Sequence, residues 1–365
     1  MLRTFFISSA VSPAAVSARM SHHDGRGTIF RNPIKTFGSG RSIALCATVL
    51  ALGFRSSADA KATITTFDPS GSTATYPTSI SQKGAITGSY KNGSGTTLGF
   101  VRAPDGTITS FAPSGATSTV GVAINARGTI AGDYLDANAV RHGFSLATDG
   151  TFSIFDPTGS QKTVVEGINA RGAITGWYED SNLVNHGFVR ARTGAITAFD
   201  PAGSIDTYAL SINRRGTIVG WYYTTNDADV YGYERNADGT IAVIDPEGSF
   251  DVTPYGINNA GTIAGSYYGD AWQGFVQSAD GTLTSFDPPG SADTYADAID
   301  SRGNVTGYYE DSSNVAHGFV RAAKGTITEF DPSGSTHTEP TAIANGAVTG
   351  NYQSDGVTHG FVRSK

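Results

Sequence analysis

Residues 282–325 read TLTSFDPPGSADTYADAIDSRGNVTGYYEDSSNVAHGFVRAAKG, and this stretch decides the fold because the chain repeats it. Its Phe-Asp-Pro tripeptide, or a variant of it, begins at Phe67, Phe111, Phe155, Phe199, Ile244, Phe286 and Phe330. The successive spacings are 44, 44, 44, 45, 42 and 44 residues. A near-constant period of this length is the signature of a repeat architecture.

Each unit contains four short segments that are rich in β-branched and aromatic residues and are bounded by Gly, Pro, Asn or Asp. In the quoted unit they are TLTSF, TYADAID, VTGYY and HGFVR. Four strands of roughly five residues in one such period match a blade of a β-propeller. Helical repeats would need a 3.6-residue periodicity and parallel β-helices have shorter coils, so neither fits.

The two ends of the repeat region complement each other. The region starts with a lone TITTFDP (residues 63–69) and stops after HGFVRSK (residues 359–365). Together the fragments complete one unit, and a closed ring leaves no exposed strand edge. We therefore predict one all-β domain over residues 61–365, a seven-bladed β-propeller of seven units of about 44 residues, closed by pairing of the N-terminal strand with the last blade.

The N-terminal region has the pattern of an export signal. An apolar run, residues 43–54, follows basic residues and precedes Ala58-Asp59-Ala60, a small-x-small cleavage pattern. The run is too short to span a bilayer as a helix. We predict that residues 1–60 are a cleaved signal peptide with an extended basic leader, with a retained membrane anchor as the alternative. The mature chain would be extracellular or periplasmic and without a membrane span.

The composition of the chain argues against some kinds of site and partner. The single cysteine, Cys46, excludes a disulfide framework and a cysteine-based metal site. Without residues 1–60 the chain keeps 18 basic and 30 acidic residues, a net charge of −12. Such acidity argues against nucleic acid as the main partner.

A recurrent His-Gly-Phe motif resembles that of a known bacterial group, the HAF-repeat family of extracellular repeat proteins. The matching residues are His142-Gly143-Phe144, His186-Gly187-Phe188, His317-Gly318-Phe319 and His359-Gly360-Phe361. Gly stands where the family name has Ala, and three units replace the His with Leu98, Tyr231 or Gln273. The resemblance implies secretion and a repeat fold, and it supplies no catalytic residues.

The repeated polar residues are interpreted first as structural. Asp156-Pro-x-Gly159 and its equivalents have the preferences of a type I turn with Asp at the first position, capping backbone amides. Ca²⁺ needs six to eight oxygen ligands, and one Asp per blade supplies too few. We therefore expect no cofactor. Bound Ca²⁺ is the alternative. Each repeated His lies before a Gly-Phe strand, and we expect it to bond the Asp that ends a strand of its own blade, as in the pair His317 and Asp331.

Two candidate binding surfaces remain. Turns of the Asn-x-Arg-Gly type between the first two strands of a unit would place four arginines around the mouth of the central channel, where they could bind carboxylate, sulfate or phosphate. They are Arg127, Arg171, Arg214 and Arg302. The alternative is that they are ordinary solvated turn residues.

The second surface combines aromatic residues that end the second strand of a unit with nearby acids and amides, a mixture that suits sugar rings. Its candidates are Trp177, Tyr178, Asp180, Trp221, Tyr222, Trp272 and Tyr309. Packing between blades is the alternative role for the aromatic residues. The loop 224–230 and Trp272 depart most from the repeat and indicate a single asymmetric site.

These observations predict an exported, monomeric, non-enzymatic binding module for glycans or a protein partner at a face of the ring. The alternatives are a secreted polysaccharide-active enzyme, a glycosidase or a lyase, and a purely structural surface protein. A glycosidase needs two placed carboxyl groups, and no acidic pair stands out from the turn acids. No catalytic residue and no metal ligand is assigned.

Overall fold

The computed structural model describes residues 62–225, 229–246 and 248–365, and its regular secondary structure over these ranges is 28 β-strands. The predicted all-β class is confirmed for this part of the chain. The predicted signal peptide, residues 1–60, lies outside the described residues, as do residues 226–228 of the loop singled out above. Within the described residues, no helix is long and apolar enough to cross a membrane.

Every repeat unit forms four antiparallel strands in the order of the chain. The first strands are β2 (Ser72–Ile80), β6 (Ser118–Ile124), β10 (Lys162–Ile168), β14 (Ser204–Ile212), β18 (Val252–Ile257), β22 (Asp293–Ile299) and β26 (His337–Ala344). The second strands are β3 (Ile86–Asn92), β7 (Ile130–Leu135), β11 (Ile174–Glu179), β15 (Ile218–Thr224), β19 (Ile263–Tyr268), β23 (Val305–Glu310) and β27 (Ala347–Ser354).

The third strands are β4 (Thr97–Arg102), β8 (Arg141–Leu146), β12 (Asn185–Arg190), β16 (Val230–Arg235), β20 (Trp272–Gln277), β24 (Ala316–Arg321) and β28 (Val357–Arg363). The fourth are β5 (Ile108–Phe111), β9 (Phe152–Phe155), β13 (Ile196–Phe199), β17 (Ile241–Ile244), β21 (Leu283–Phe286) and β25 (Ile327–Phe330), together with β1 (Ile64–Phe67) from the start of the repeat region.

The strand β1 pairs antiparallel with β28, with Phe67 opposite Gly360. It therefore takes the place of the fourth strand beside β26, β27 and β28. Four units form separate four-stranded sheets, and three four-stranded groups are joined into one larger sheet by the single parallel bridges Ala74 to Thr358 and Thr97 to Ser118.

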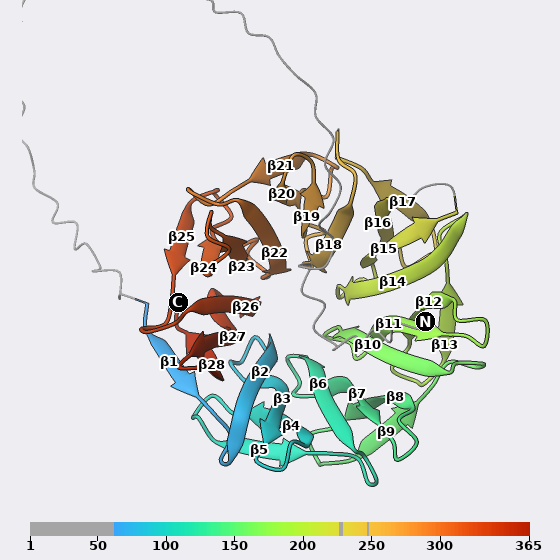
Figure 1. Ribbon diagram of the computed structural model, residues 1–365. Helices are drawn as coiled ribbons and strands as arrows, with labels where there is room; N and C mark the ends of the chain where they lie inside the picture. Colours follow the sequence, from blue (N-terminus) through green and yellow to red (C-terminus); the bar gives the residue numbers. More distant parts are fainter. Residues whose placement is uncertain (1–61, 226–228, 247) are drawn as a thin grey trace, which may run out of the picture. The chain divides into compact units, whose positions relative to one another are not determined.

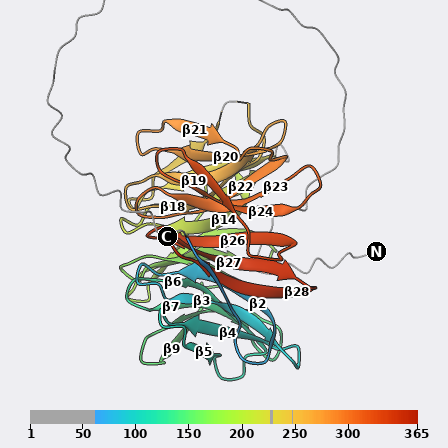
Figure 2. The ribbon, with the colours of Figure 1, turned by 90° about the vertical axis from the view of Figure 1, so that its left-hand side faces the viewer.

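The units are arranged in a ring (Figure 1), and the first strand of each unit is the innermost. Each innermost strand contacts the next one, and β26 contacts β2. Figure 2 shows the ring from its edge, with the strands running across its thickness. The innermost strands therefore border the centre of the ring.

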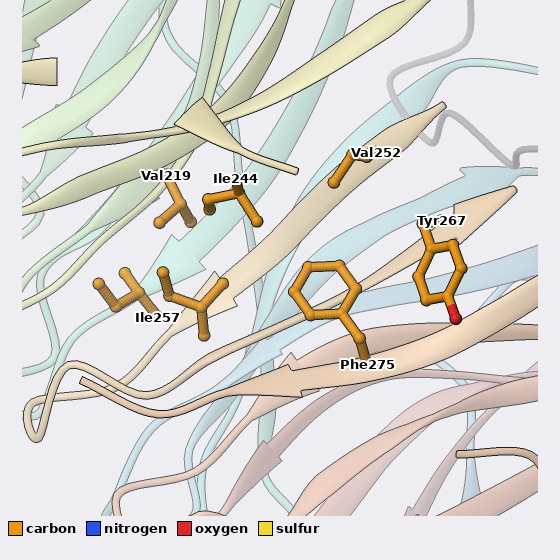
Figure 3. Close-up of a cluster of buried hydrophobic side chains, with 7 residues drawn as sticks. Val219, Ile244, Val252, Ile257, Tyr267 and Phe275 are labelled. Atoms are coloured by element: carbon orange, nitrogen blue, oxygen red, sulfur yellow. The ribbon is translucent and has the colours of Figure 1, made fainter. Parts of the chain in front are cut away.

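The hydrophobic core lies between neighbouring units. The Phe of the His-Gly-Phe motif is completely buried in every unit that has it, and Phe188 packs edge-on against Phe155 of the preceding unit, with 6.1 Å between ring centroids. Figure 3 shows one such interface, where Val219 and Ile244 of one unit meet Val252, Ile257 and Phe275 of the next. Burying such a side chain contributes about 1.5–3 kcal/mol, so each unit is stabilised by its neighbours.

The Gly of the His-Gly-Phe motif is required by close packing. A Cβ atom on Gly187 would lie 2.9 Å from Cε2 of Phe199 on the adjacent strand β13. The Phe199 ring occupies the space that a side chain at position 187 would need. This contact explains why Gly stands between the His and the Phe of the motif.

Candidate functional site

The four repeated histidines bond the Asp that follows the fourth strand, as predicted. The Nδ1 atom of His317 lies 2.8 Å from Oδ2 of Asp331. The same pair, at 2.7 Å, occurs as His142 with Asp156, His186 with Asp200, and His359 with Asp68. The last pair links the two ends of the repeat region.

Each of these imidazoles also packs on a Tyr of the second strand, as Tyr309 does on His317 with 5.2 Å between ring centroids. The partner Asp is shared with the next unit, because Thr163 Oγ1 donates to Asp156 Oδ1 at 2.6 Å. Among the described residues no group of three or more His, Cys, Asp and Glu side chains could hold a metal ion. The contacts give the repeated His, Asp and Tyr a structural role.

The predicted role of the Asp in the Asp-Pro-x-Gly turns is wrong. The turn bond runs from Ser160 N to Pro157 O at 3.1 Å, so Pro157 occupies the first turn position and Gly159, with φ +84°, the third. The side chain of Asp156 is engaged by His142 and Thr163, and it is therefore unable to cap the turn.

Asp180, one of the predicted ligand-binding residues, closes the turn between β11 and β12. Its Oδ1 accepts hydrogen bonds from the backbone N–H groups of Asn182 (2.8 Å) and Val184 (3.0 Å). These bonds, with Val184 the larger contributor, lower the pKa of the Asp180 carboxyl. The carboxylate is thus held by its own turn.

The predicted aromatic residues divide between the two faces of each sheet, because successive strand residues point to opposite faces. Tyr178, Tyr222 and Tyr309 lie on the same face as the repeated His position. Tyr178 packs on His186 at 5.1 Å and Tyr222 on Tyr231 at 5.5 Å, and Tyr222 and Tyr309 are buried. These three residues pack between units, which was the alternative considered from the sequence.

Trp177 and Trp221 point to the other face and are joined there by a residue that the sequence did not single out, Tyr208. The ring of Tyr208 stacks on Trp221 with 3.9 Å between centroids and meets Trp177 edge-on at 5.1 Å. Tyr223 adds an edge contact to Trp221 at 5.3 Å. We call Trp177, Tyr208, Trp221 and Tyr223 the aromatic patch. Tyr208 lies directly opposite Trp221 in the β14–β15 register. Predicting that register would have identified Tyr208 as a contact of Trp221.

Polar groups adjoin the aromatic patch. The amide nitrogen of Asn185 donates to Oδ1 of Asp206 and to the hydroxyl of Tyr208, both at 2.9 Å. Its amide oxygen is buried and has no hydrogen-bond partner. An unpaired buried acceptor is costly, so the bonds that Asn185 makes to Asp206 and Tyr208 are formed at the expense of its own amide oxygen.

Trp272 belongs to a second cluster and not to the aromatic patch. It packs against Tyr268 at 5.7 Å and Tyr295 at 5.8 Å, and Tyr295 packs against Tyr308 at 4.8 Å. The residues come from β19, β20, β22 and β23. The structure therefore separates the predicted tryptophans into two clusters.

Both clusters include a cross-strand pair between the first and second strands whose residues differ from unit to unit. Around it, the first strand repeats Thr in six units and the second strand repeats Gly in all seven. The pairs are Tyr76–Ser89, Val120–Asp133, Val164–Trp177, Tyr208–Trp221, Thr253–Ser266, Tyr295–Tyr308 and Glu339–Asn351. We call this the variable pair. Its differences between units make this face of the sheets the place where a single site can arise.

A half-buried carboxyl adjoins the aromatic patch. Glu166 lies at a bulge in β10, where the register shifts between Val165 and Gly167. Trp177 Nε1 donates to its Oε1 at 3.1 Å, and burial raises the pKa of the Glu166 carboxyl to about 8. Bulges re-aim a side chain, and this one gives the site a carboxyl that is protonated at neutral pH. The sequence shows Glu166 only as an unusual acid in an apolar strand.

The opposite end of the ring centre is a cavity of about 180 Å³ lined by residues from all seven innermost strands and the turns after them. Of the four predicted arginines, Arg214 lines this cavity, and Arg127, Arg171 and Arg302 are not among its lining residues. Those three occupy the next turn position, and their side chains are exposed. Isoleucines such as Ile168 form the apolar part of the lining.

The Asn of these turns links neighbouring units. The side-chain nitrogen of Asn169 donates to the backbone oxygen of Asn213 at 3.0 Å, while its Oδ1 accepts from Arg171 N and Ala173 N. Similar bonds join Asn125 to Asn169, Asn213 to Asn258, and Asn258 to Asp300. This belt of amides is structural, and it accounts for the repeated Asn.

The arginines at the ends of the third strands pack against Phe rings. Arg190 lies over the ring of Phe155, a residue of the preceding unit, at 4.7 Å from its centroid, and burial lowers its pKa. The same contact occurs as Arg102 over Phe67, Arg235 over Phe199, Arg321 over Phe286 and Arg363 over Phe330. These arginines join units through cation–π contacts.

Comparison with solved structures shows similarity to streptogramin B lyase, with 14% identity, a TM-score of 0.55, and coverage of 83% of this chain and 98% of that one. Oligogalacturonate lyase in complex with manganese matches with 11% identity, a TM-score of 0.58, and coverage of 83% and 96%. A puromycin hydrolase matches over 78% of this chain and 51% of its own, with 11% identity and a TM-score of 0.56. At such identities the likeness shows the fold alone, which is that of a β-propeller. No family model and no curated protein matches the sequence.

Proposed function

We propose that this chain is an exported, monomeric, seven-bladed β-propeller, closed by β1 on β28, that binds a glycan at the aromatic patch. The observation that carries the proposal is the stack of Tyr208 on Trp221, flanked by Trp177 and Tyr223 and set in the variable pair position. Six of the seven units carry something else at that pair. The export and the seven-blade closure rest on the sequence pattern and on the pairing of β1 with β28.

The chemistry of the aromatic patch suits a sugar. Ring faces attract the C–H face of a pyranose, while amides and carboxylates bond its hydroxyl edge. The unpaired oxygen of Asn185 and the carboxylate of Asp206 lie beside Tyr208. Tyr208, Trp221 and Tyr223 are partly exposed, whereas Trp177 is buried and supports them.

A glycan array probed with the purified protein, with and without Ca²⁺ and at two salt concentrations, tests this proposal. We expect binding to neutral glycans that persists at high salt, since it depends on apolar contact and hydrogen bonds. Trp221→Ala should weaken it at least tenfold, which corresponds to about 1.4 kcal/mol. Phe250→Ala, a change of an exposed aromatic outside the patch, is the matched control. The absence of glycan binding under all conditions would contradict the proposal. The remaining candidate functions would then be binding of a protein partner and a structural role.

A secreted polysaccharide-active lyase or glycosidase is the second candidate, and Glu166 favours it. A carboxyl with a pKa of about 8 is a proton donor at neutral pH, and it is bonded to a residue of the aromatic patch. A glycosidase or lyase would cleave a glycan that the array identifies, and Glu166→Gln would abolish cleavage while leaving binding intact. Binding without cleavage by the unaltered protein would exclude this candidate.

A further inference from the structure

A cavity of about 500 Å³ lies between the fourth unit (β14–β17) and the fifth unit (β18–β21). The fourth unit lines it with the β14–β15 turn, the end of β16 and the β16–β17 turn, and the fifth unit with the β18–β19 and β20–β21 turns. Pockets that bind small molecules have volumes of about 300–1,000 Å³. The cavity therefore has the size of a small-molecule site.

Glu234 on β16 lines this cavity at a position where no other unit has a charge. The equivalent residues are Val101, Ser145, Val189, Val276, Val320 and Val362. Each of the five valines packs against a hydrophobic cluster that its unit forms with the next one. Glu234 lies on the corresponding face, because Val219 directly opposite it belongs to the cluster shared with the fifth unit. The fourth unit thus has a carboxyl where five units pack an aliphatic side chain.

The Glu234 carboxyl has no partner in the part of the chain that the structure describes. It makes neither a hydrogen bond nor an ion pair there, and burial raises its pKa. The fifth unit contributes only Gly261 and Ala279 to the cavity, whereas the counterparts of Ala279 in the third and seventh units are the basic residues Arg192 and Lys365. A nearby cation favours the ionised form of a partly buried carboxyl, and the fifth unit supplies none to the cavity.

The other charged residues of the lining are Arg215 and Asp238. The Arg215 side chain is exposed, and within the described ranges it forms no ion pair, with Glu234 or with any other acid. Asp238 is held by its own turn, since its Oδ1 accepts from Thr240 N at 3.0 Å and from Thr240 Oγ1 at 2.7 Å, and these bonds lower its pKa. The cavity therefore contains one cation and one carboxyl that do not pair with each other.

We propose that this cavity binds a free amino acid, with the ammonium group of the ligand on the Glu234 carboxylate and its carboxylate on the Arg215 guanidinium. Charge-assisted hydrogen bonds form at both ends of such a zwitterion, and a guanidinium can bind a carboxylate through two parallel bonds. A simple amine or a simple acid would engage only one of the two residues. The site is separate from the aromatic patch and does not depend on glycan binding there.

Ligand-observed NMR of the purified protein tests this site, with the standard L-amino acids as probes. We expect saturation transfer from the protein to one or more of them. Two blocked forms of each amino acid that binds are the chemical controls: the N-acetyl derivative lacks the ammonium group, and the amino acid amide lacks the carboxylate. Each blocked form should bind at least about tenfold more weakly, because it loses one of the two charge-assisted contacts.

Glu234→Gln and Arg215→Gln should each weaken amino acid binding at least about tenfold, for the same reason. Arg127→Gln, at the same turn position in the second unit, and Asp355→Asn, in the exposed β27–β28 turn, are the matched controls and should bind normally. Glu234→Val introduces the residue that five other units have there. It should abolish binding and melt at the same or a higher temperature, because it removes a carboxyl from a packing position.

Three results would overturn the proposal: no saturation transfer to any of the amino acids, blocked forms that bind as well as the free amino acid, or binding by Glu234→Gln that matches that of the unaltered protein. The aromatic patch is unchanged in these variants. Glycan binding by Glu234→Gln therefore separates failure of this site from failure of the patch.

Discussion

Trp177 and Tyr178 are adjacent in β11, yet they lie on opposite faces of one sheet and have opposite roles. Tyr178 packs on His186 in an arrangement that recurs in four units. Trp177 contacts Tyr208 and bonds Glu166 in an arrangement that occurs once. The face that carries Tyr178, the repeated His and the buried Phe is the repeated face, and the face that carries the variable pair is the variable face. The comparison shows that the contacts of the repeated face recur from unit to unit, whereas those of the variable face differ between units.

The largest effect is expected on the repeated face. Phe188→Ala should lower the free energy of unfolding by about 3–5 kcal/mol, because it leaves a cavity between two units. Guanidinium denaturation measures this change. Val243→Ala, which shortens an exposed side chain, is the control and should change stability by less than about 0.5 kcal/mol. A loss below about 1 kcal/mol for Phe188→Ala would contradict the assignment of this face to assembly.

Glu166→Gln tests the variable face through the pH dependence of the free energy of unfolding. The folded state holds the Glu166 proton up to a pKa of about 8, whereas the unfolded chain releases it near its ordinary, lower pKa. The folded state therefore binds more protons between these values, and this carboxyl makes stability fall as pH rises from about 5 to 8. At pH 8 the variant should be more stable than the unaltered protein by on the order of 1–3 kcal/mol, with little difference at pH 4.5. Equal stability at both pH values would show that Glu166 is solvated.

His317→Gln tests whether the repeated His is structural. It should cost about 1–2 kcal/mol, since Gln keeps part of the bond to Asp331 and loses the contact with Tyr309. Gln273 already stands at the equivalent place, with Nε2 at 3.2 Å from Asp287 Oδ2. Thermal melting measures the loss, and unchanged ligand binding is its control. A loss of binding without a loss of stability would assign the histidine to recognition.

The smallest effect is expected from the turn arginines. Arg127→Gln should change the free energy of unfolding by less than about 0.5 kcal/mol, because the side chain is exposed. Arg190→Gln should cost more, about 1 kcal/mol, because it removes the cation–π contact with Phe155. Chemical denaturation of both variants under one set of conditions measures the difference. A larger cost for Arg127 would reverse the assignment.

Much of the repeated face could be predicted from the sequence. The strand pattern, the buried Phe and the bond between His317 and Asp331 all follow from residues that recur at one spacing. The second partner of the turn Asp was missed, since a turn pattern does not reveal that Thr163 of the next unit donates a hydrogen bond to Asp156. The turn pattern did not distinguish Arg214 from Arg127, Arg171 and Arg302, although Arg214 comes one position earlier in its turn and is the one of the four that lines the cavity.

The variable face was predicted only in part. Trp177 and Trp221 stood out as large aromatic residues, but their contact through Tyr208 depends on cross-strand register and on the angle between two units. Glu166 could not be distinguished from a solvated acid, since its contact with Trp177 depends on a bulge in β10 that no local pattern predicts.

The sequence by itself determined the repeat period, the β-strands, the glycine turns and the apolar positions, because these depend on local backbone preference and on alternation along a strand. The tertiary structure alone decided which buried polar groups have no hydrogen-bond partner and which aromatic residues are in contact. Those properties arise at contacts between units, where burial and the geometry of neighbouring strands set the free energy of a charge. No local pattern encodes them.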